Sequence, residues 1–231
     1  MKPDALRTVT GAMRFHERKQ QAVAHNLANA STRGFKAEQV FARMVPGSAP
    51  VADGRTDLRA GSVNPTGNAL DIALEGTGFL VVETPDGTRL SRGGSFSLNE
   101  YGALVDETGA RLLGSSGEIV LPEGGEVEIG ADGAISVDGE QVDALRMESA
   151  DPTVLRRQDG GYFLPEPGDR NSEPPADLKV RQGHLEESNV DPVGTMVEMI
   201  DGLRVYASLQ RSAQSIDGVR RTVANDLARI D

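Results

Sequence analysis

The chain has 231 residues, a net charge of −11, 27 glycines and no cysteine. This length allows one or two domains with real cores. Without cysteine there can be no disulfide framework, thiolate nucleophile or cysteine-ligated zinc site. The acidic balance argues against general binding to nucleic acid or to anionic membranes. The start lacks the apolar segment of an ordinary secretory signal, and apolar runs such as Phe79-Leu80-Val81-Val82 are too short to span a bilayer, so we expect no membrane insertion.

The first predicted element is a helix from Asp4 to Asn29, which holds no proline and one glycine. Apolar or neutral residues recur in it at a spacing of three or four, which is typical of a helix with one narrow apolar face. This face contains Leu6, Val9, Met13, Val23 and Leu27, together with His16 and Gln20. We expect Gly34 to end the helix as a left-handed cap and Phe35 to begin an extended segment.

The last predicted element is a second helix that begins at Asp191-Pro192, with the aspartate as N-cap and the proline in the first turn. If it continues to the terminus it is roughly 58 Å long. Its narrow apolar face is formed by Met199, Tyr206, Leu209, Ile216, Val223, Leu227 and Ile230, with Gly202 and Ala213 between them and Arg220 as a polar position. We call the apolar residues of the two faces the seam residues.

Between the helices, apolar residues recur at every second position, as they do in β-strands. Strands are predicted at 79–83, 88–91, 126–129 and 134–137, with turns at 85–87, 99–102, 132–133 and 138–139. Turns at this spacing, with no helix between them, indicate a small antiparallel β domain. The segments Val45–Asp57 and Pro165–Pro175 are rich in Pro, Gly, Ser and Asp, and they indicate linkers.

The fold class is therefore α+β, a small antiparallel β domain flanked by long terminal helices. The expected parts are a helix in 1–36, an extended connector in 37–75, the β domain in 76–169, a returning connector in 170–187 and a helix in 188–231. The two helices could form an intramolecular pair that caps the β domain. Alternatively, the seam residues become buried only when copies pack together. A helix of roughly 58 Å favours the second arrangement, because a compact domain of ~100 residues has a radius of gyration of only about 13 Å.

No pattern indicates catalysis, a cofactor or a metal. His16, His25 and His184 have no metal-ligand spacing, and His16 is expected to be packed on its helix. Gly76-Thr77-Gly78 lacks the third glycine of a dinucleotide loop and precedes a strand, so it is expected to provide a tight entry into that strand. We therefore expect no catalytic residue, no cofactor and no metal site.

Four stretches together carry a family resemblance. They are Gln21 to Lys36, Pro65 to Phe79, Arg92 to Phe96, and Leu185 to Pro192 followed by Met196 to Ile200. In this order they resemble the bacterial flagellar basal-body rod and hook proteins. The positions that match the terminal signatures are Asn26, Leu27, Ala28, Asn29, Thr32, Gly34, Phe35, Lys36, Ser188, Asn189 and Val190.

The resemblance is closest to proximal-rod subunits, because the interval between Lys36 and Gly67 is too short for the extra segment of distal-rod subunits. It implies terminal helices that pair as a coiled coil in the assembled tube, with the β domain outside. The implied function is mechanical, a rod segment that transmits torque and encloses the export channel. The implied partners are copies of the chain, other rod and hook subunits and the flagellar type III export apparatus. The implied location is the basal body, outside the cytoplasmic membrane, after export without a cleaved signal peptide.

Two alternatives remain open from the sequence. One is a distal-rod or other hook-basal body subunit, since His25 stands where an asparagine is common in the family. The more distant one is a soluble glycan-binding or glycan-hydrolysing β domain, for which acidic residues of the middle segment would be the candidates.

Overall fold

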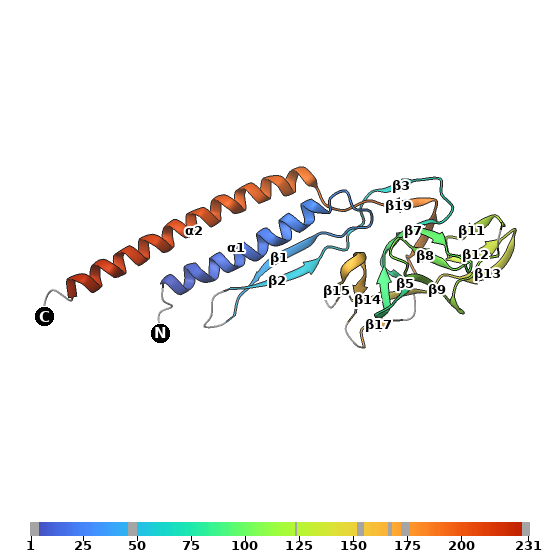
Figure 1. The fold of residues 1–231 in the computed structure, drawn as a ribbon, viewed down its shortest axis with the longest axis horizontal. Coiled ribbons are helices and arrows are strands. Elements are labelled where there is room, and N and C mark those ends of the chain that lie inside the picture. The colour runs from blue at the N-terminus through green and yellow to red at the C-terminus, as the bar shows by residue number, and fades with distance from the viewer. Residues whose placement is uncertain are drawn as a thin grey trace. The chain divides into compact units, whose positions relative to one another are not determined.

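The computed structural model describes residues 5–45, 50–122, 124–151, 155–165, 168–171 and 176–227. The chain forms two compact units. The helical unit comprises Met1–Ala30, Ala37–Asp57 and Val190–Asp231, and the β unit comprises Ser31–Lys36 and Leu58–Asn189. The fold is α+β, with mostly β-strands and two long helices (Figure 1).

The helices are α1, Ala5–Ala28, and α2, Pro192–Leu227. A short 3-10 turn occupies Asp159–Gly161. The strands are β1 Glu38–Arg43, β2 Val51–Thr56, β3 Val63–Pro65, β4 Asp71–Glu75, β5 Phe79–Thr84, β6 Gly87–Ser91, β7 Gly93–Leu98, β8 Leu104–Asp106, β9 Arg111–Gly114, β10 Gly117–Glu118, β11 Val127–Ile129, β12 Ala134–Val137, β13 Glu140–Ala144, β14 Met147–Ala150, β15 Arg156–Arg157, β16 Phe163–Leu164, β17 Arg170–Asn171, β18 Lys179–Gln182 and β19 His184–Glu186.

The β unit is organised around one twelve-stranded sheet, whose main path runs β15-β16-β6-β5-β9-β8-β7-β4-β18. Strand β5 is buried on both faces: Leu80 and Val82 belong to the larger hydrophobic core, and Phe79 and Val81 to a smaller one. A continuous apolar run suits such a position, because successive side chains point to opposite faces of the sheet. A three-stranded sheet, β11-β12-β13, contributes Ile129, Ile135 and Val137 to the larger core.

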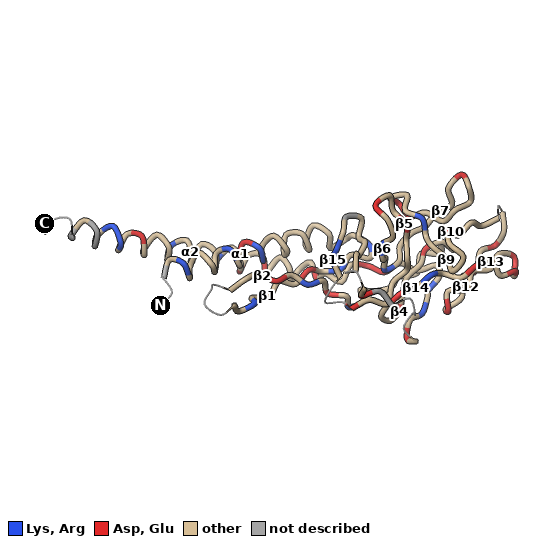
Figure 2. Tube along the Cα trace, turned by 90° about the horizontal axis from the view of Figure 1, so that it is seen from below, with Lys and Arg blue, Asp and Glu red and all other residues tan. Residues whose placement is uncertain are grey.

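The strand predictions for the middle of the chain are confirmed, because the segments 79–83, 88–91, 126–129 and 134–137 coincide with β5, β6, β11 and β12. The turn at 138–139 joins β12 to β13 so that Val137 pairs with Glu140. Asp138 has a φ of 52°, which is the left-handed conformation that this two-residue hairpin loop requires. Acidic residues are concentrated in the β unit, as Figure 2 shows by its red segments.

Both predicted helices are present, and the predicted start of the second is confirmed. The backbone N–H of Val193 donates to the Asp191 carboxylate at 3.1 Å, so Asp191 is the N-cap of α2. The predicted role of Gly34 is wrong, because α1 ends at Ala28 and residues 29–32 form turns. Gly34 has a φ of +65°, and its N–H donates to the carbonyl of Glu186 at 2.6 Å instead. No helix in the described part of the chain is long and apolar enough to cross a membrane.

The segments expected to be connectors contain strands that pair over long sequence distances. Strand β4 pairs with β18, and β3 pairs with β19, so parts of 37–75 and 170–187 belong to the β unit. The expected linker Val45–Asp57 contains β2, which pairs with β1 over six residues. These strands lack a long apolar alternation of their own, and backbone hydrogen bonds to a distant partner place them in sheets. Part of the second expected linker, Pro165–Pro175, lies outside the described residues.

Candidate assembly interface

The helical unit has three layers, with α1 in the middle. Helix α2 lies antiparallel along one side of α1, and the β1–β2 hairpin lies on another side (Figure 1). Ala22 and Val23 of α1 are therefore buried, although the neighbours of α1 are only one helix and one two-stranded hairpin. The arrangement gives α1 two packing faces, whereas its sequence pattern indicates one.

A polar side chain is inserted between the two helices. The Gln20 amide nitrogen donates to the carbonyl oxygen of Met199 at 3.0 Å. The helix backbone of α2 can approach Gln20 because residue 202 is glycine, and a Cβ at that position would collide with the Gln20 amide nitrogen. Gln20 and Gly202 thus fix the register of α1 against α2 at one point.

A groove of about 370 Å³ runs between α1 and α2 near the start of α2. Val23, Val197 and Val205 form its apolar part, and Lys19 Nζ lies 2.8 Å from Glu198 Oε1 at its rim. His16 also lines the groove, and its partial burial, followed by the positive charge of Lys19, lowers the pKa of the imidazole below its usual 6.5. His16 is thus packed on its helix, as predicted.

The contact of α1 with the hairpin depends on Asn26, one of the signature residues. The side-chain amide of Asn26 donates to the carbonyl of Glu38 and accepts from the Glu38 N–H, both at 2.8 Å. One side chain therefore satisfies both backbone groups of a strand residue, as a neighbouring strand would. Arg18, two turns earlier on α1, forms an ion pair with the Glu38 carboxylate. The hairpin is thus fixed to α1 at the residue where β1 begins.

The seam residues occupy the less exposed positions of both helices. Val23 is buried, and the half-buried ones are Leu6, Val9, Met13, Leu27, Met199, Tyr206, Leu209 and Ile216. Half-burial at a spacing of three or four is expected where one helix lies along another. The side chains of Val223 and Leu227, and the whole of Ile230, lie outside the described residues.

In the β unit, the two terminal signatures meet around a buried ion pair. Lys36 Nζ lies 2.6 Å from Glu186 Oε1, and the two side chains are 0% and 2% exposed. Lys36 also donates to the carbonyl of Arg59 at 2.9 Å, and the N–H of Gly61 donates to the same Glu186 oxygen at 2.8 Å. The pair is therefore hydrogen-bonded by backbone groups, which a buried pair of charges needs.

The two signature segments also contact each other through their backbones and side chains. The Asn189 N–H donates to the carbonyl of Phe35 at 3.2 Å, and the Asn189 side chain donates to the carbonyl of Arg59 at 2.9 Å. The Arg157 guanidinium lies 3.8 Å from the centre of the Phe35 ring and donates to the carbonyl of Lys36 at 2.8 Å. These contacts give Phe35, Lys36 and Asn189 a structural role in the β unit.

The other signature residues lie at the end of α1, in the turns that follow it, or just before α2. The Asn29 amide donates to the carbonyl of His25 at 2.9 Å near the end of α1, and the carbonyl of Thr32 accepts from the Phe35 N–H at 3.2 Å. Ala28 is exposed, and Ser188 and Val190 are half-buried.

Sequence reasoning missed three residues of this arrangement, Arg92, Arg157 and Glu186. Arg92 Nε lies 3.9 Å from Glu186 Oε2, and the guanidinium donates to the carbonyls of Gly78 and Leu74. Burial lowers the pKa of Arg92, and the charge of Glu186 acts in the opposite direction. A usable signal existed for Glu186, because it lies within the C-terminal signature while Lys36, of opposite charge, lies within the N-terminal one.

The raised pKa of Tyr162 is explained by its position in the core of the β unit. Burial, followed by the hydrogen bond that its hydroxyl donates to Asp106, raises the pKa of Tyr162. Asp106 also accepts from the backbone N–H groups of Thr108 and Ala110, which fixes the turn between β8 and β9. Among the described residues, no three of His, Cys, Asp or Glu are grouped so that they could hold a metal ion.

Two family models match the chain. The flagellar hook protein FlgE/F/G D1 domain matches residues 73–137, and the flagellar basal body rod FlgEFG protein C-terminal region matches residues 181–227. The first match begins in β4 and ends with β12, and the second runs from β18 to the end of α2.

Curated relatives match almost the whole chain. The flagellar basal-body rod protein FlgF of Mesorhizobium japonicum is 32% identical to it, over 96% of this chain and 98% of its own length. The chain belongs to the family of flagellar basal-body rod proteins. The FlgF protein of Salmonella typhimurium is 33% identical over 92% of this chain and 94% of its own. The flagellar basal-body rod protein FlgG of Bacillus subtilis is 28% identical over 92% of this chain and 95% of its own length. As a flagellar basal-body rod protein, the chain is a structural subunit of the rod.

Proposed function

We propose that this rod protein is a proximal-rod subunit that polymerises through its terminal helices into the drive shaft, where it transmits torque and encloses the export channel. The observation that carries the proposal is the helical unit itself, in which the two long helices lie side by side and the described seam residues other than Val23 are only half-buried. Apolar side chains that remain half-exposed along a whole helix favour further packing against other helices.

The helices are proposed to become part of a coiled coil on assembly, inside the tube, with the β unit outside. Helix α2 has 36 residues and α1 has 24, so α2 is longer by about 18 Å at 1.5 Å per residue. Packing against helices of neighbouring subunits would bury the apolar side of this additional length. Gln20 provides a polar position in the apolar face, of the kind that sets the register of coiled coils.

The proximal position rests on the relatives and on the chain's own segment lengths. The FlgF relatives are 32% and 33% identical, against 28% for the FlgG relative. The residues after Lys36 form the β1–β2 hairpin and β3, without a further long segment before β4. A distal-rod or other hook-basal body position is the alternative.

The family also supports partners and a location. The proposed partners are copies of this chain, other rod and hook subunits and, during export, the flagellar type III apparatus. The proposed location is the basal body on the periplasmic side of the cytoplasmic membrane, reached without cleavage of a signal peptide. Since the role is mechanical, we propose that the protein has no enzymatic activity.

The proposal is tested by deleting the gene and examining the structure of the purified basal bodies. Basal bodies are purified from a strain that lacks this gene and from the same strain complemented with it. Incomplete rods in the first and complete rods that contain the chain next to the export apparatus in the second support the proposal. A chain that is absent from the purified rods, or that cleaves a glycan through one carboxylate, would contradict it.

A further inference from the structure

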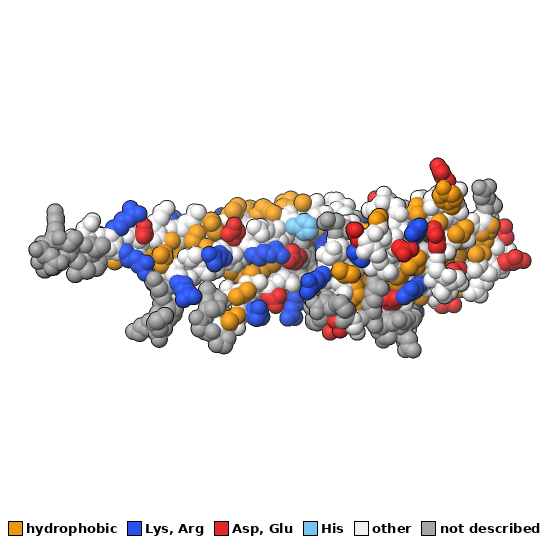
Figure 3. Space-filling view, turned by 60° about the horizontal axis from the view of Figure 1, so that its bottom comes forward, with side chains coloured by type: hydrophobic (Ala, Val, Ile, Leu, Met, Phe, Trp, Pro, Cys, Tyr) orange, Lys and Arg blue, Asp and Glu red, His pale blue; other side chains and the backbone are white. Residues whose placement is uncertain are grey.

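Three charged side chains are buried together in the β unit. Other charged side chains are spread over the surface, as the blue and red atoms in Figure 3 show, but Lys36, Arg92 and Glu186 are 0%, 5% and 2% exposed. Among the described residues, Arg92 Nε and Glu186 Oε2 have no hydrogen-bond partner, although they lie 3.9 Å apart. Such a group is an inefficient source of stability, because apolar side chains of similar volume often stabilise a protein as well or better. Its position in the chain indicates a second role.

This position is where the chain passes between the helical unit and the β unit. The chain does so at four crossing points, which follow Ala30, Lys36, Asp57 and Asn189. Any load that the backbone carries from one unit to the other enters the β unit in the residues beside these points. Lys36 is itself such a residue, and Glu186 lies three positions before Asn189.

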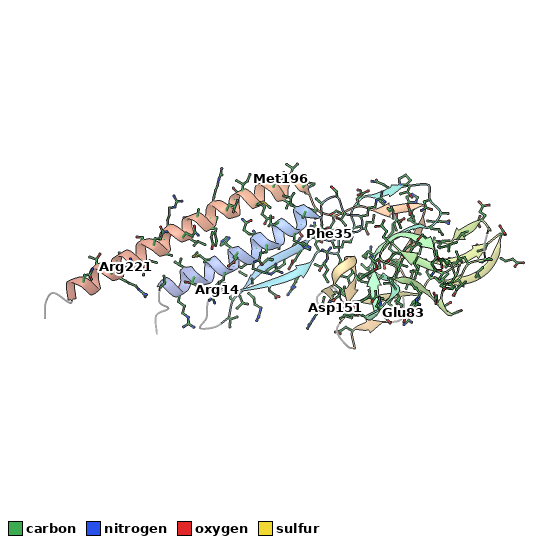
Figure 4. The ribbon with its side chains drawn as sticks, viewed as in Figure 1. Arg14, Phe35, Glu83, Asp151, Met196 and Arg221 are labelled. Atoms are coloured by element: carbon green, nitrogen blue, oxygen red, sulfur yellow. The ribbon has the colours of Figure 1, made fainter. Side chains whose placement is uncertain are left out.

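The segments beside three of the crossing points are bonded to one another within the β unit. The Asn189 N–H donates to the carbonyl of Phe35, which is labelled in Figure 4, at 3.2 Å. The carbonyl of Arg59 accepts from the Asn189 side chain and from Lys36 Nζ, both at 2.9 Å. A load on any one of these segments is therefore shared by bonds to the other two.

The buried charges continue these contacts into the main sheet. Lys36 Nζ lies 2.6 Å from Glu186 Oε1, and Arg92 faces the other oxygen of the same carboxylate. The Arg92 guanidinium donates to the carbonyls of Gly78 and Leu74. Leu74 is fully buried in β4, which pairs with β7 and with β18. The bonds thus lead from the crossing points to an interior strand of the sheet.

We propose that Lys36, Arg92, Glu186 and Asn189 form a mechanical anchor, which transfers load from the crossing points into the sheet of the β unit. We call these four the anchor residues. The inference rests on the proposed function, because torque is the load that a rod subunit carries. Charge-assisted hydrogen bonds suit this role, since they are strong and directional, whereas apolar contacts have no direction.

An anchor differs from an ordinary stabilising contact in its dependence on direction. Removal of a contact that only stabilises the β unit weakens the unit against forces from every direction. Removal of an anchor weakens it when the load enters at the crossing points, and leaves it unchanged when the load bypasses them. The direction of pulling therefore separates the two roles.

The absence of cysteine from the chain allows this direction to be chosen. Chains with two introduced cysteines are held between DNA handles in optical tweezers, which measure the force of unfolding. Tyr101→Cys with Val193→Cys loads the anchor, because Val193 lies beyond the crossing point that follows Asn189. Tyr101→Cys with Val142→Cys pulls on the β unit alone, and all three positions of attachment are exposed.

The decisive variant is Asn189→Ala, which removes the side-chain hydrogen bond to the Arg59 carbonyl. We expect a lower unfolding force in the first direction and an unchanged force in the second. Arg92→Lys keeps the charge but not the two-pronged donation to backbone carbonyls, so it should lower the same force. Thr84→Val is the matched control, because Thr84 in the β5–β6 hairpin also donates one side-chain hydrogen bond to a backbone carbonyl, and it should change neither force.

Three results would overturn the inference. An equal loss of force in both directions would mean that the anchor residues only stabilise the β unit. An unchanged force in the first direction for Asn189→Ala would mean that the contact carries no load, and an equal loss in Thr84→Val would mean that the effect is not specific. Each of these leaves the proposed function intact, which fails separately if the unaltered chain is absent from purified basal bodies.

Discussion

Lys36 and Glu186 are 150 positions apart in the sequence, and they form an ion pair of 2.6 Å that is almost fully shielded from solvent. Each belongs to one of the two signature stretches of the chain. Their contact shows that the end of the first signature and the start of the second lie together in the β unit.

Removal of one member of this pair is expected to destabilise the β unit strongly. Lys36→Met leaves the buried Glu186 carboxylate with only the more distant Arg92 as a cation, and breaking a buried ion pair typically costs about 3–5 kcal/mol. The free energy of unfolding of the purified chain in urea measures the loss. In the matched control, Lys19→Met, an exposed ion pair with Glu198 is removed, and a change of about 1 kcal/mol or less is expected. If the free energy of unfolding falls equally in Lys36→Met and Lys19→Met, the buried ion pair contributes no more to stability than the exposed one.

The insertion of Gln20 beside Gly202 gives the second prediction. Gly202→Ala places a Cβ where the Gln20 amide nitrogen lies, so we expect α1 and α2 to separate locally and stability to fall by about 1–3 kcal/mol. Gly218→Ala is the control, since nothing lies within 4 Å of a Cβ there, and helix propensity alone should stabilise α2 by up to about 1 kcal/mol. The melting temperature of each purified variant is compared. If the melting temperature falls as much on Gly202→Ala in a Gln20→Ala background as in the unaltered chain, the loss does not come from a collision with Gln20.

The third prediction concerns the hairpin. Asn26→Ala removes the two hydrogen bonds to the backbone of Glu38 and leaves that N–H and carbonyl without the side chain that satisfies them. We expect a loss of about 2 kcal/mol and faster amide exchange at Glu38. Gln21→Ala, an exposed position on the same helix, should leave the exchange rate unchanged. Unaltered protection of the Glu38 amide in Asn26→Ala would contradict the assignment.

The fourth prediction concerns pH. Partial burial and then the charge of Lys19 lower the pKa of His16 in the folded chain. The unfolded chain therefore binds a proton at this residue more readily, and the stabilising contribution is present above about pH 6.5 and is lost as pH falls below it. Stability measured between pH 7.5 and 5.5 should decline less in His16→Gln, and less in Lys19→Gln, than in the unaltered chain. An identical decline in all three would contradict the prediction.

The sequence predicts the local parts of this fold and misses the non-local ones. The Asp191-Pro192 start of α2, the buried run of β5 and the Asp138-Gly139 turn follow from residues that are adjacent in the chain. Pairing of β4 with β18 or of β3 with β19 depends on segments more than one hundred positions apart, and no short-range pattern encodes it. The hairpin was missed because its inner face contacts α1 through Asn26 and Arg18 instead of through a regular apolar alternation.

The candidate interface shows the same limit. The seam residues were identified from helical spacing, and their role in assembly stays a prediction. The insertion of Gln20 beside Gly202 could not be predicted from helical spacing, because it depends on how closely the two helices approach.

The measurement that tests the central claim most directly compares assembly with folding for Ile216→Asp. Ile216 is half-buried in the single chain, so the aspartate should change the melting temperature of the purified subunit little. In the rod its position among packed helices would bury an unpaired charge, at a cost of several kcal/mol per copy. The account predicts that Ile216→Asp is lost from purified basal bodies while the exposed neighbour variant Ser215→Asp is retained. Normal incorporation of Ile216→Asp, or a strongly lowered melting temperature of the purified subunit, would contradict assembly through the helices.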